Sequence, residues 1–442
     1  MVSPGVRRRV TSVLSRRLEV GNADAQTLIE AVYPLWPAGR WSVRRSGPVG
    51  GVRSWLVIPS LAGPVLLVPP LCPSAAMSLR PQGTGNGEVK IQLLSYLQRL
   101  GLLRLLPLPR LVLEDPGSSG AAVAVLERAL GPIHDLVVRL GRRRYNRALV
   151  LLPFGPDGQP LAFVKVARGA TARQVLEREH KALSFVSAQA VPGLRVPAPI
   201  AHVEDGGLGY LMMTTLISDA ISRPRPVPVD QMRALSRVGG HPRSGSALRD
   251  TRVATRLRRL VRELNDPGQR RWTGTALDAL LAQLGDVVVR EGTWHGDWVP
   301  WNMSRKDGEV LLWDWEHFDV HGLSSWDHVH YIAQDLRVRL GTDPVAEDAW
   351  LAEAEEAMSA EWGLDELQRQ AVLRTYLLEV NLRYLHDRQE DPRGTPEREG
   401  WARELIERLD PGATSRAAGS EAGSEAGSET VGEAGPDVRA AS

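Results

Sequence analysis

Residues 294–316 read Trp-His-Gly-Asp-Trp-Val-Pro-Trp-Asn-Met-Ser-Arg-Lys-Asp-Gly-Glu-Val-Leu-Leu-Trp-Asp-Trp-Glu. Three polar side chains stand in this stretch at a meaningful spacing, because Asn302 follows Asp297 by five residues and Asp314 follows Asn302 by twelve. A turn and the apolar run Val310–Trp313 predict a β-hairpin that brings Asp314 back beside the other two. Such a triad suits phosphoryl transfer: one carboxylate accepts a hydroxyl proton, while an amide oxygen and a second carboxylate hold Mg²⁺ against nucleotide phosphates.

Each of these residues also has a plain structural interpretation. Asp297 and Asp314 could cap turns, and His295 could be a packed histidine with satisfied ring nitrogens. The whole constellation at this spacing favours the catalytic interpretation, since a motif counts only when its structural context also fits.

The sequence His295-Gly296-Asp297, followed by Asn302, an apolar strand and Asp314, resembles the catalytic core of the aminoglycoside phosphotransferase and choline kinase group. That group has a protein-kinase-like fold and phosphorylates small molecules. The resemblance implies that Asp297 is the catalytic base and that Asn302 and Asp314 are the Mg²⁺ ligands. It also implies that His295 and Gly296 shape the loop.

A lysine inside an apolar strand is the second feature with chemical meaning. Lys165 lies in the predicted strand Leu161–Val166, and an ammonium group is costly to bury without an anionic partner. The next predicted helix, Thr171–Ala188, offers Glu177 and Glu179. In the group that the chain resembles, the strand lysine binds the α- and β-phosphates and a helix glutamate holds it, which favours Glu179. The alternative is an edge-strand lysine that reaches solvent.

The expected nucleotide site has two further parts. The predicted strand Tyr210–Thr215 leads to the hinge where kinase-like proteins meet the adenine, so Met213 and Thr215 are candidate nucleotide-binding residues, although plain core is equally expected there. The basic turn Arg142–Arg147 stands where many kinases carry a glycine-rich loop. Its guanidinium groups could bind phosphate or remain solvated, and the sequence does not decide between ATP and GTP.

The composition is that of a soluble globular protein. The chain has 442 residues, of which 43% are hydrophobic and 24% charged, and a formal charge of only +2 does not indicate a nucleic-acid partner. The single cysteine, Cys72, permits no intrachain disulfide and fits the cytoplasm. We identify no signal peptide and no membrane-spanning segment, and therefore expect no membrane partner.

We expect an α+β, two-lobed, protein-kinase-like fold with additions at both ends. Residues 1–130 would form an N-terminal α/β accessory segment, residues 131–216 a small β-rich nucleotide-binding N-lobe, and residues 217–410 a helical C-lobe with the catalytic and metal site. The glycines of Gly83–Gly87 lack the ending of a P-loop and favour a connector. Residues 411–442 contain Ala-Gly-Ser-Glu repeats, which predict a disordered tail.

The charges of the C-terminal half leave the substrate open. A basic stretch at Arg249–Arg262 would suit an anionic substrate and an acidic one at Gly341–Gln368 a cationic substrate, but such runs are usually solvated faces. Glu316, His317 and Asp319 lie near the expected substrate cleft. Histidines follow closely in sequence and invite a zinc hypothesis: His317, His321, His328 and His330. A helix is the favoured interpretation beyond residue 326, with a structural role for Asp327, because helical residues two apart do not face each other.

The sequence therefore predicts an ATP- and Mg²⁺-dependent phosphotransferase that acts on a hydroxyl of an aminoglycoside-, choline- or sugar-like molecule. The alternative is a kinase-shaped, pseudokinase-type nucleotide-binding protein with little turnover. A protein kinase ranks last, because the chain has His-Gly-Asp in place of His-Arg-Asp and no Asp-Phe-Gly. The acceptor, the oligomeric state, protein partners and the role of residues 1–130 are not determined by the sequence.

Overall fold

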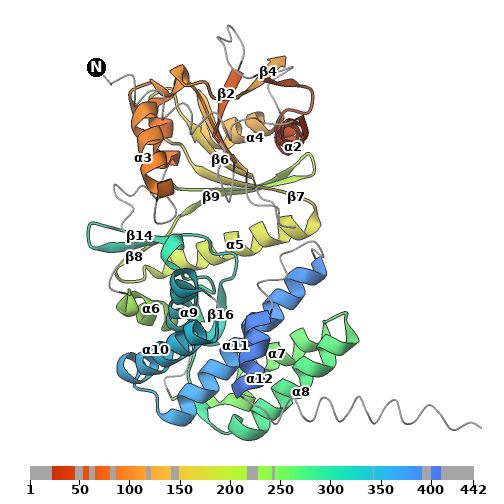
Figure 1. Cartoon of the computed structure of the whole chain (residues 1–442), viewed down its shortest axis with the longest axis vertical. Helices are drawn as coiled ribbons and strands as arrows, with labels where there is room; N and C mark the ends of the chain where they lie inside the picture. Colours follow the sequence, from red (N-terminus) through yellow and green to blue (C-terminus); the bar gives the residue numbers. More distant parts are fainter. Residues whose placement is uncertain are drawn as a thin grey trace, which may run out of the picture. The chain divides into compact units, whose positions relative to one another are not determined.

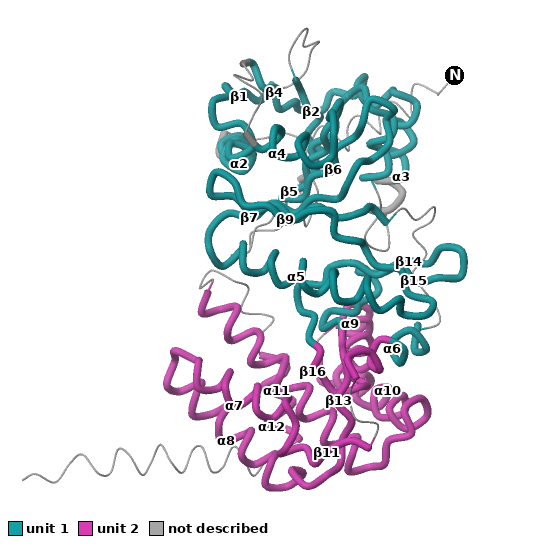
Figure 2. Tube along the Cα trace, turned by 180° about the vertical axis from the view of Figure 1, so that it is seen from behind, with its two compact units in different colours: residues 1–234, 295–319 teal, residues 235–294, 320–442 magenta. Residues whose placement is uncertain are grey.

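The computed structural model describes residues 22–44, 53–58, 65–79, 86–115, 121–140, 149–216, 227–240, 244–341, 343–390 and 400–409. The chain packs as two compact units (Figure 2): unit 1 comprises residues 1–234 and 295–319, and unit 2 comprises residues 235–294 and 320–442. The basic turn Arg142–Arg147, most of Gly83–Gly87 and the tail from residue 411 lie outside the described residues. The predicted domain boundaries stay predictions.

Unit 1 is built on a nine-stranded sheet in the order β1-β4-β2-β3-β5-β6-β7-β10-β9, with antiparallel neighbours throughout. The strands are β1 (Arg40–Arg44), β2 (Arg53–Ile58), β3 (Val65–Val68), β4 (Arg110–Asp115), β5 (Asp135–Leu140), β6 (Leu149–Phe154), β7 (Phe163–Arg168), β9 (Pro199–Asp205) and β10 (Leu208–Met213). Strands β7 and β10 overlap the predicted strands Leu161–Val166 and Tyr210–Thr215, whereas β4 and β9 were not predicted. The β3–β5 pair joins the strands before residue 131 to those after it, so both segments share one sheet.

Both faces of the sheet are covered, because successive side chains of a strand point to opposite faces. In β2, Trp55 and Val57 pack on the side of α2 (Asn22–Val32) and α4 (Ala121–Leu130). Leu56 and Ile58 pack on the side of α3 (Asn86–Arg99) and the 3₁₀ helix η2 (Pro73–Ser78). Figure 1 shows α3 and the α2–α4 pair on opposite sides of the sheet.

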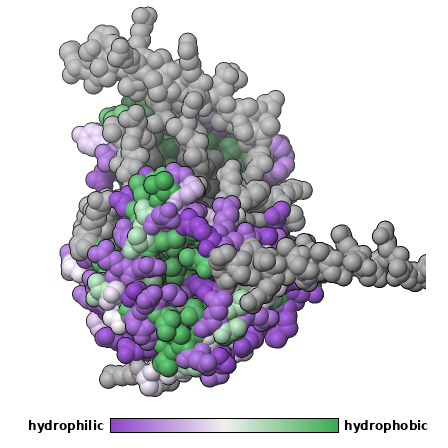
Figure 3. Space-filling model, turned by 60° about the horizontal axis from the view of Figure 1, so that its bottom comes forward, coloured by the Kyte–Doolittle hydropathy of each residue, from purple (hydrophilic) through white to green (hydrophobic). Residues whose placement is uncertain are grey.

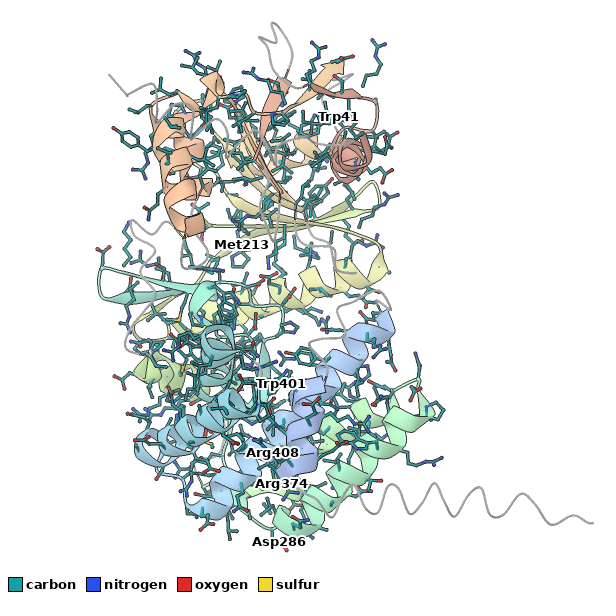
Figure 4. All side chains as sticks on the ribbon, viewed as in Figure 1. Trp41, Met213, Asp286, Arg374, Trp401 and Arg408 are labelled. Atoms are coloured by element: carbon teal, nitrogen blue, oxygen red, sulfur yellow. The ribbon has the colours of Figure 1, made fainter. Side chains whose placement is uncertain are left out.

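A tryptophan cluster packs between the first strands and α2. The ring centroids of Trp36, Trp41 and Trp55 lie 5.4–5.8 Å apart, and the Trp55 indole donates a hydrogen bond to the Leu136 carbonyl oxygen at 2.6 Å. Trp41 is labelled in Figure 4. Aromatic side chains bury large apolar areas, so this cluster contributes much of the buried area on the α2–α4 side of the sheet.

Helix α5 (Ala170–Gln189) packs against β7, β9 and β10. It is the predicted helix, extended by one residue at each end. A three-stranded sheet contains β14 (Met303–Lys306), β15 (Glu309–Leu312) and β8 (Leu194–Arg195), and the β14–β15 pair is the hairpin that the sequence predicts. The 3₁₀ helix η5 (Pro300–Asn302) leads into β14.

Unit 2 is mainly helical, as predicted for the second part of the chain. Its helices are the 3₁₀ helix η4 (Leu248–Asp250), α7 (Arg252–Arg262), α8 (Pro267–Leu284), α9 (Trp326–Leu340), α10 (Pro344–Trp362), α11 (Glu366–Glu390) and α12 (Gly400–Leu409). Short strands accompany them: β11 (Ser246–Ala247), β12 (Val288–Val289), β13 (Glu291–Trp294) and β16 (Asp319–Leu323). Helix α6 (Val229–Ser236) contains the residue at which unit 1 gives way to unit 2 in sequence.

The core of unit 2 combines tryptophans with buried charged side chains. Trp350 packs edge-on against Trp401, which Figure 4 labels on α12, with centroids 5.9 Å apart. Arg256 Nη2 lies 2.9 Å from Glu379 Oε2, and both side chains are at least 86% buried. On the face drawn in Figure 3, hydrophobic areas are interspersed with hydrophilic residues.

The structure does not support the zinc hypothesis within the described residues. His328 and His330 lie on α9, where His328 Nδ1 accepts a hydrogen bond from the Trp362 indole and His330 Nδ1 lies 3.0 Å from the Tyr376 hydroxyl. No group of three metal-ligating side chains occurs in the described part of the chain. No described helix is long and apolar enough to cross a membrane.

Candidate active site

Lys165 of β7 joins two carboxylates that are distant in sequence. Its Nζ lies 2.7 Å from each carboxylate oxygen of Glu179 on α5 and 2.6 Å from Asp314 Oδ1, just after β15. The side chains of Lys165 and Glu179 are 12% and 1% exposed. The buried ammonium thus has the anionic partner that its strand position requires. Glu177, the other candidate, instead pairs with Lys181 on the surface.

The sheet register explains why Lys165 points toward α5. Lys165 lies opposite Val150 of β6 and Leu211 of β10, whereas its neighbours Val164 and Val166 belong to the core on the α2–α4 side. A strand alternates faces, so Lys165 faces the other way. There α5 presents Glu179, and the amide of Trp315 donates to Glu179 Oε1 at 3.3 Å.

The loop that carries Asp297 is fixed by hydrogen bonds to the hairpin. The buried His295 donates through Nε2 to the Trp313 carbonyl oxygen and accepts at Nδ1 from the Asp297 amide, both at 3.2 Å. Asn302 Nδ2 donates to Asp297 Oδ2 at 2.8 Å and to the Asp297 carbonyl oxygen at 3.0 Å. The Trp313 amide donates to the Asn302 carbonyl oxygen at 3.0 Å. These bonds hold Asp297 and Asn302 beside the residue that precedes Asp314.

Two residues of the motif have unusual backbone conformations. Gly296 has φ +83°, and a Cβ atom there would lie 2.2 Å from the His317 carbonyl oxygen, so only glycine fits. Asp314 has φ +73°. A non-glycine residue in this region costs about 1–3 kcal/mol, and such strain concentrates at functional sites.

The site holds more negative than positive charge. Burial, together with the charges of Asp314, Glu179 and Asp297, raises the pKa of Glu316 to about 8 against the opposing effect of Lys165. Burial would lower the pKa of Lys165, but the carboxylates of Asp314 and Glu179 outweigh it, so this pKa is raised and the ammonium stays charged. Burial would likewise raise the pKa of Asp314, but the charge of Lys165 keeps it below its usual value. The carboxylates of Glu179, Asp297 and Asp314 around one ammonium favour an additional cation.

The chemistry of the available donor atoms fits Mg²⁺. Asn302 uses its Nδ2 for Asp297, which leaves the amide oxygen Oδ1 as a ligand atom. Asp314 uses Oδ1 for Lys165, and its side chain is 35% exposed, so Oδ2 remains. Carboxylate and amide oxygens are hard ligands of the kind that Mg²⁺ binds.

The two hinge candidates lie at the end of β10. Met213, labelled in Figure 4, is buried and pairs with Phe163, two residues before Lys165. Because Leu211 is the partner of Lys165, Met213 points to the same face of the sheet as Lys165. Thr215 is half-buried beyond the strand end. Direct contact between either residue and the Lys165–Asp314 pair is not observed.

One carboxylate of the site was not among the predicted site residues. Glu316 was expected near the substrate cleft without a role, yet its pKa responds to four charged groups of the site. The sequence signal was the Asp-Trp-Glu spacing, which places a further carboxyl group two residues after Asp314.

Comparison with known proteins gives a family for part of the chain. Residues 156–323 match the model of the Phosphotransferase enzyme family. The sequence has no significant match among curated proteins.

Three solved structures illustrate the structural likeness. An aminoglycoside phosphotransferase in a ternary complex with ADP and hygromycin B has 14% identity and a TM-score of 0.44, covering 65% of this chain and 96% of that chain. A choline kinase of Streptococcus pneumoniae has 13% identity and a TM-score of 0.43, covering 66% and 98%. An amicoumacin kinase in complex with AMP-PNP, Ca²⁺ and Ami has 12% identity and a TM-score of 0.38, covering 66% of this chain and 93% of that chain. Likeness at this level does not bear on substrate or mechanism.

The matched region begins before β7 and ends with β16, and it therefore includes Lys165, Glu179, Asp297, Asn302 and Asp314. Residues 156–323 of this chain are a domain of the phosphotransferase enzyme family.

Proposed function

We propose that this protein is a small-molecule kinase that transfers the γ-phosphoryl group of ATP to a hydroxyl group of its substrate. The contact of Lys165 with both Glu179 and Asp314 is the observation that supports this proposal most directly. The ammonium of Lys165 bridges a carboxylate on α5 and a carboxylate that follows the β14–β15 hairpin. A phosphate-binding lysine requires this arrangement, in which a helix glutamate holds the lysine beside a metal ligand.

In this proposal Lys165 binds the α- and β-phosphates. Glu179 is almost fully buried and holds the ammonium through both oxygens, so it limits the rotamers of Lys165 before nucleotide arrives. A positioned cation stabilises developing phosphate charge without reorganising during the reaction. Met213 and Thr215 would lie along the adenine side of the same nucleotide.

Asp297 is the proposed general base. It accepts the proton of the substrate hydroxyl as that oxygen attacks the γ-phosphorus, and ADP leaves. Asn302 donates to Asp297 Oδ2 and thereby orients the carboxylate. Asn302 and Asp314 would hold Mg²⁺, which supplies charge neutralisation on the phosphates.

The acceptor would be a hydroxylated small molecule of the aminoglycoside, choline or sugar class. The family match supports a phosphotransferase in general, and the excess of carboxylates around Asp297 favours an acceptor that carries amino groups. The single cysteine fits action in the cytoplasm.

Turnover and nucleotide binding test the proposal separately. ADP formation is measured with a panel of aminoglycosides, amino alcohols and sugars, and Asp297→Asn should lower turnover by about a hundredfold or more. The control is Asp307→Asn in the exposed turn of the same hairpin, where φ is +52° and asparagine fits. Equal activity of Asp297→Asn and wild type would contradict the role of Asp297.

Nucleotide binding is measured as a thermal shift with ATP or GTP, each with and without Mg²⁺. A ligand that binds only the folded state raises its stability, and Asp314→Ala should abolish the Mg²⁺-dependent part of the shift. The absence of any shift at millimolar nucleotide would refute the kinase proposal.

A further inference from the structure

Exposed apolar side chains gather on and around α3. We call the following six side chains the α3 ridge, with exposed fractions of 41–71%: Leu71, Leu93, Tyr96, Leu100, Leu102 and Leu105. Five of them fall within thirteen residues of sequence. Single exposed apolar residues are normal on a protein surface, but a concentration of this kind marks an interaction site.

The α3 ridge is exposed because the opposite face of the helix is anchored. Gln98 Nε2 donates to the carbonyl oxygens of Pro69 at 2.9 Å and Cys72 at 2.6 Å, and Ser95 Oγ donates to the Ala76 carbonyl oxygen at 3.0 Å. Leu94 is buried on that face. Leu93, Tyr96 and Leu100 recur at i, i+3 and i+7 and therefore share the outer face. Leu71 lies between the two residues that bind Gln98.

The turn after α3 continues the ridge. In the 3₁₀ helix η3 (Leu103–Leu105), Leu103 is fully buried and Leu105 is 71% exposed. The preceding Leu102 is also exposed. The buried Leu103 fixes the conformation of the turn. Leu102 and Leu105 therefore point outward because of the backbone conformation.

Between Glu88 and Glu114, the segment that carries most of the ridge has charged residues of one sign only. The segment 89–113 contains Lys90, Arg99, Arg104 and Arg110 but no Asp or Glu. Arg99 and Arg104 are exposed. An apolar strip flanked by arginines, with tyrosine among its leucines, has the composition of segments that lie in a membrane interface.

Other occupants fit this surface less well. The C-terminal residues 411–442 contain no Leu, Ile or aromatic residue, so they cannot fill an apolar ridge. Residues 1–21 carry arginines at positions 7, 8, 9, 16 and 17 and would meet like charge. A second copy related by a twofold axis would bring the same basic side chains together. The partner must provide an apolar layer that the leucine side chains can enter and negative charge for the arginines.

We propose that the α3 ridge docks the protein on an anionic lipid membrane surface. The leucines and Tyr96 enter the interface at headgroup level, while Arg99 and Arg104 contact lipid phosphates. The protein is held at the surface, and no helix among the described residues crosses the bilayer. This binding is independent of the proposed phosphotransfer.

Flotation with lipid vesicles tests the docking of the full chain. Binding is compared on phosphatidylcholine vesicles and on vesicles that also contain phosphatidylglycerol. Binding to the anionic vesicles is expected, and it should fall with added salt. Leu93→Ser with Leu105→Ser should lower the partition constant on the order of tenfold per leucine. Arg99→Glu with Arg104→Glu should remove the preference for anionic lipid.

Matched variants in unit 2 serve as controls. Val345 and Leu367 are 78% and 56% exposed, and their double serine variant should bind vesicles like wild type. The exposed Arg262 and Arg271 provide the control for the charge reversal. No binding to anionic vesicles, or equal losses in ridge and control variants, would overturn the proposal. Self-association that the ridge variants abolish would also overturn it, because a second copy would then be the occupant.

Discussion

Replacing Lys165 with Met should destabilise the protein by about 3 kcal/mol, at the lower end of the roughly 3–5 kcal/mol measured when one partner of a buried ion pair is removed. The ammonium contacts three carboxylate oxygens at 2.6–2.7 Å, and Glu179 is 1% exposed, so its carboxyl group would be left buried without its cation. Asp314 is 35% exposed and keeps part of its solvation, which favours the lower value. Methionine fills most of the lysine volume, so little of the loss comes from a cavity.

Urea unfolding followed by tryptophan fluorescence measures this loss. The control is Lys181→Met, which removes an ammonium 2.6 Å from Glu177 on the exposed face of the same helix, with side chains 71% and 49% exposed. Such a surface pair contributes little to stability, because water and salt screen it. Glu179→Gln added to Lys165→Met should restore stability, because no carboxylate is then stranded at that position. A loss with Lys165→Met no larger than that with Lys181→Met would refute the buried-pair reasoning.

Two further changes test the loop and the carboxylates. Gly296→Ala should cost at least about 2 kcal/mol and most of the activity, since its Cβ would lie 2.2 Å from the His317 carbonyl oxygen at φ +83°. Gly308→Ala, at φ +81° with nothing within 4 Å of the added Cβ, should show the backbone strain alone in the same urea titration. The raised pKa of Glu316 means that the folded state retains a proton that the unfolded state loses above pH 4.5, so stability should fall as pH rises from about 4.5 to about 8. Glu316→Gln should remove that part of the slope in unfolding measured across this range, and an unchanged slope would contradict the assignment.

The sequence predicts the site where chemistry and periodicity agree. The β14–β15 hairpin follows from a turn followed by an apolar run, and it carries Asp314 back to the loop of Asp297 and Asn302. Lys165 was informative because an ammonium in an apolar strand requires an anion, and the next helix supplied one. The roles of these residues in catalysis stay predictions.

The sequence does not predict what depends on distant pairing. Strand β4 follows a leucine-rich segment with prolines and without a clear period, and its partners β1 and β2 lie more than fifty residues earlier. Strand β9 begins with Pro199 and has mixed polarity, and its place at the edge of the sheet explains why both are tolerated. The sequence also does not predict the α3 ridge. An exposed leucine cannot be distinguished in sequence from a leucine that packs in a core.

The segment 295–319 packs with unit 1, although it lies far along the chain from the sheet. Lys165, Glu179, Asp297, Asn302 and Asp314 therefore all belong to one compact unit, formed from two separate stretches of sequence. Within it, the departures from ordinary protein structure coincide: Asp314 has a positive φ, and carboxyl groups outnumber the ammonium of Lys165. Packing alone gains nothing from either feature. Both features have a physical reason if a cation and phosphate groups complete the charge balance. Ligand binding then stabilises the folded state and offsets the free energy that the unliganded site costs.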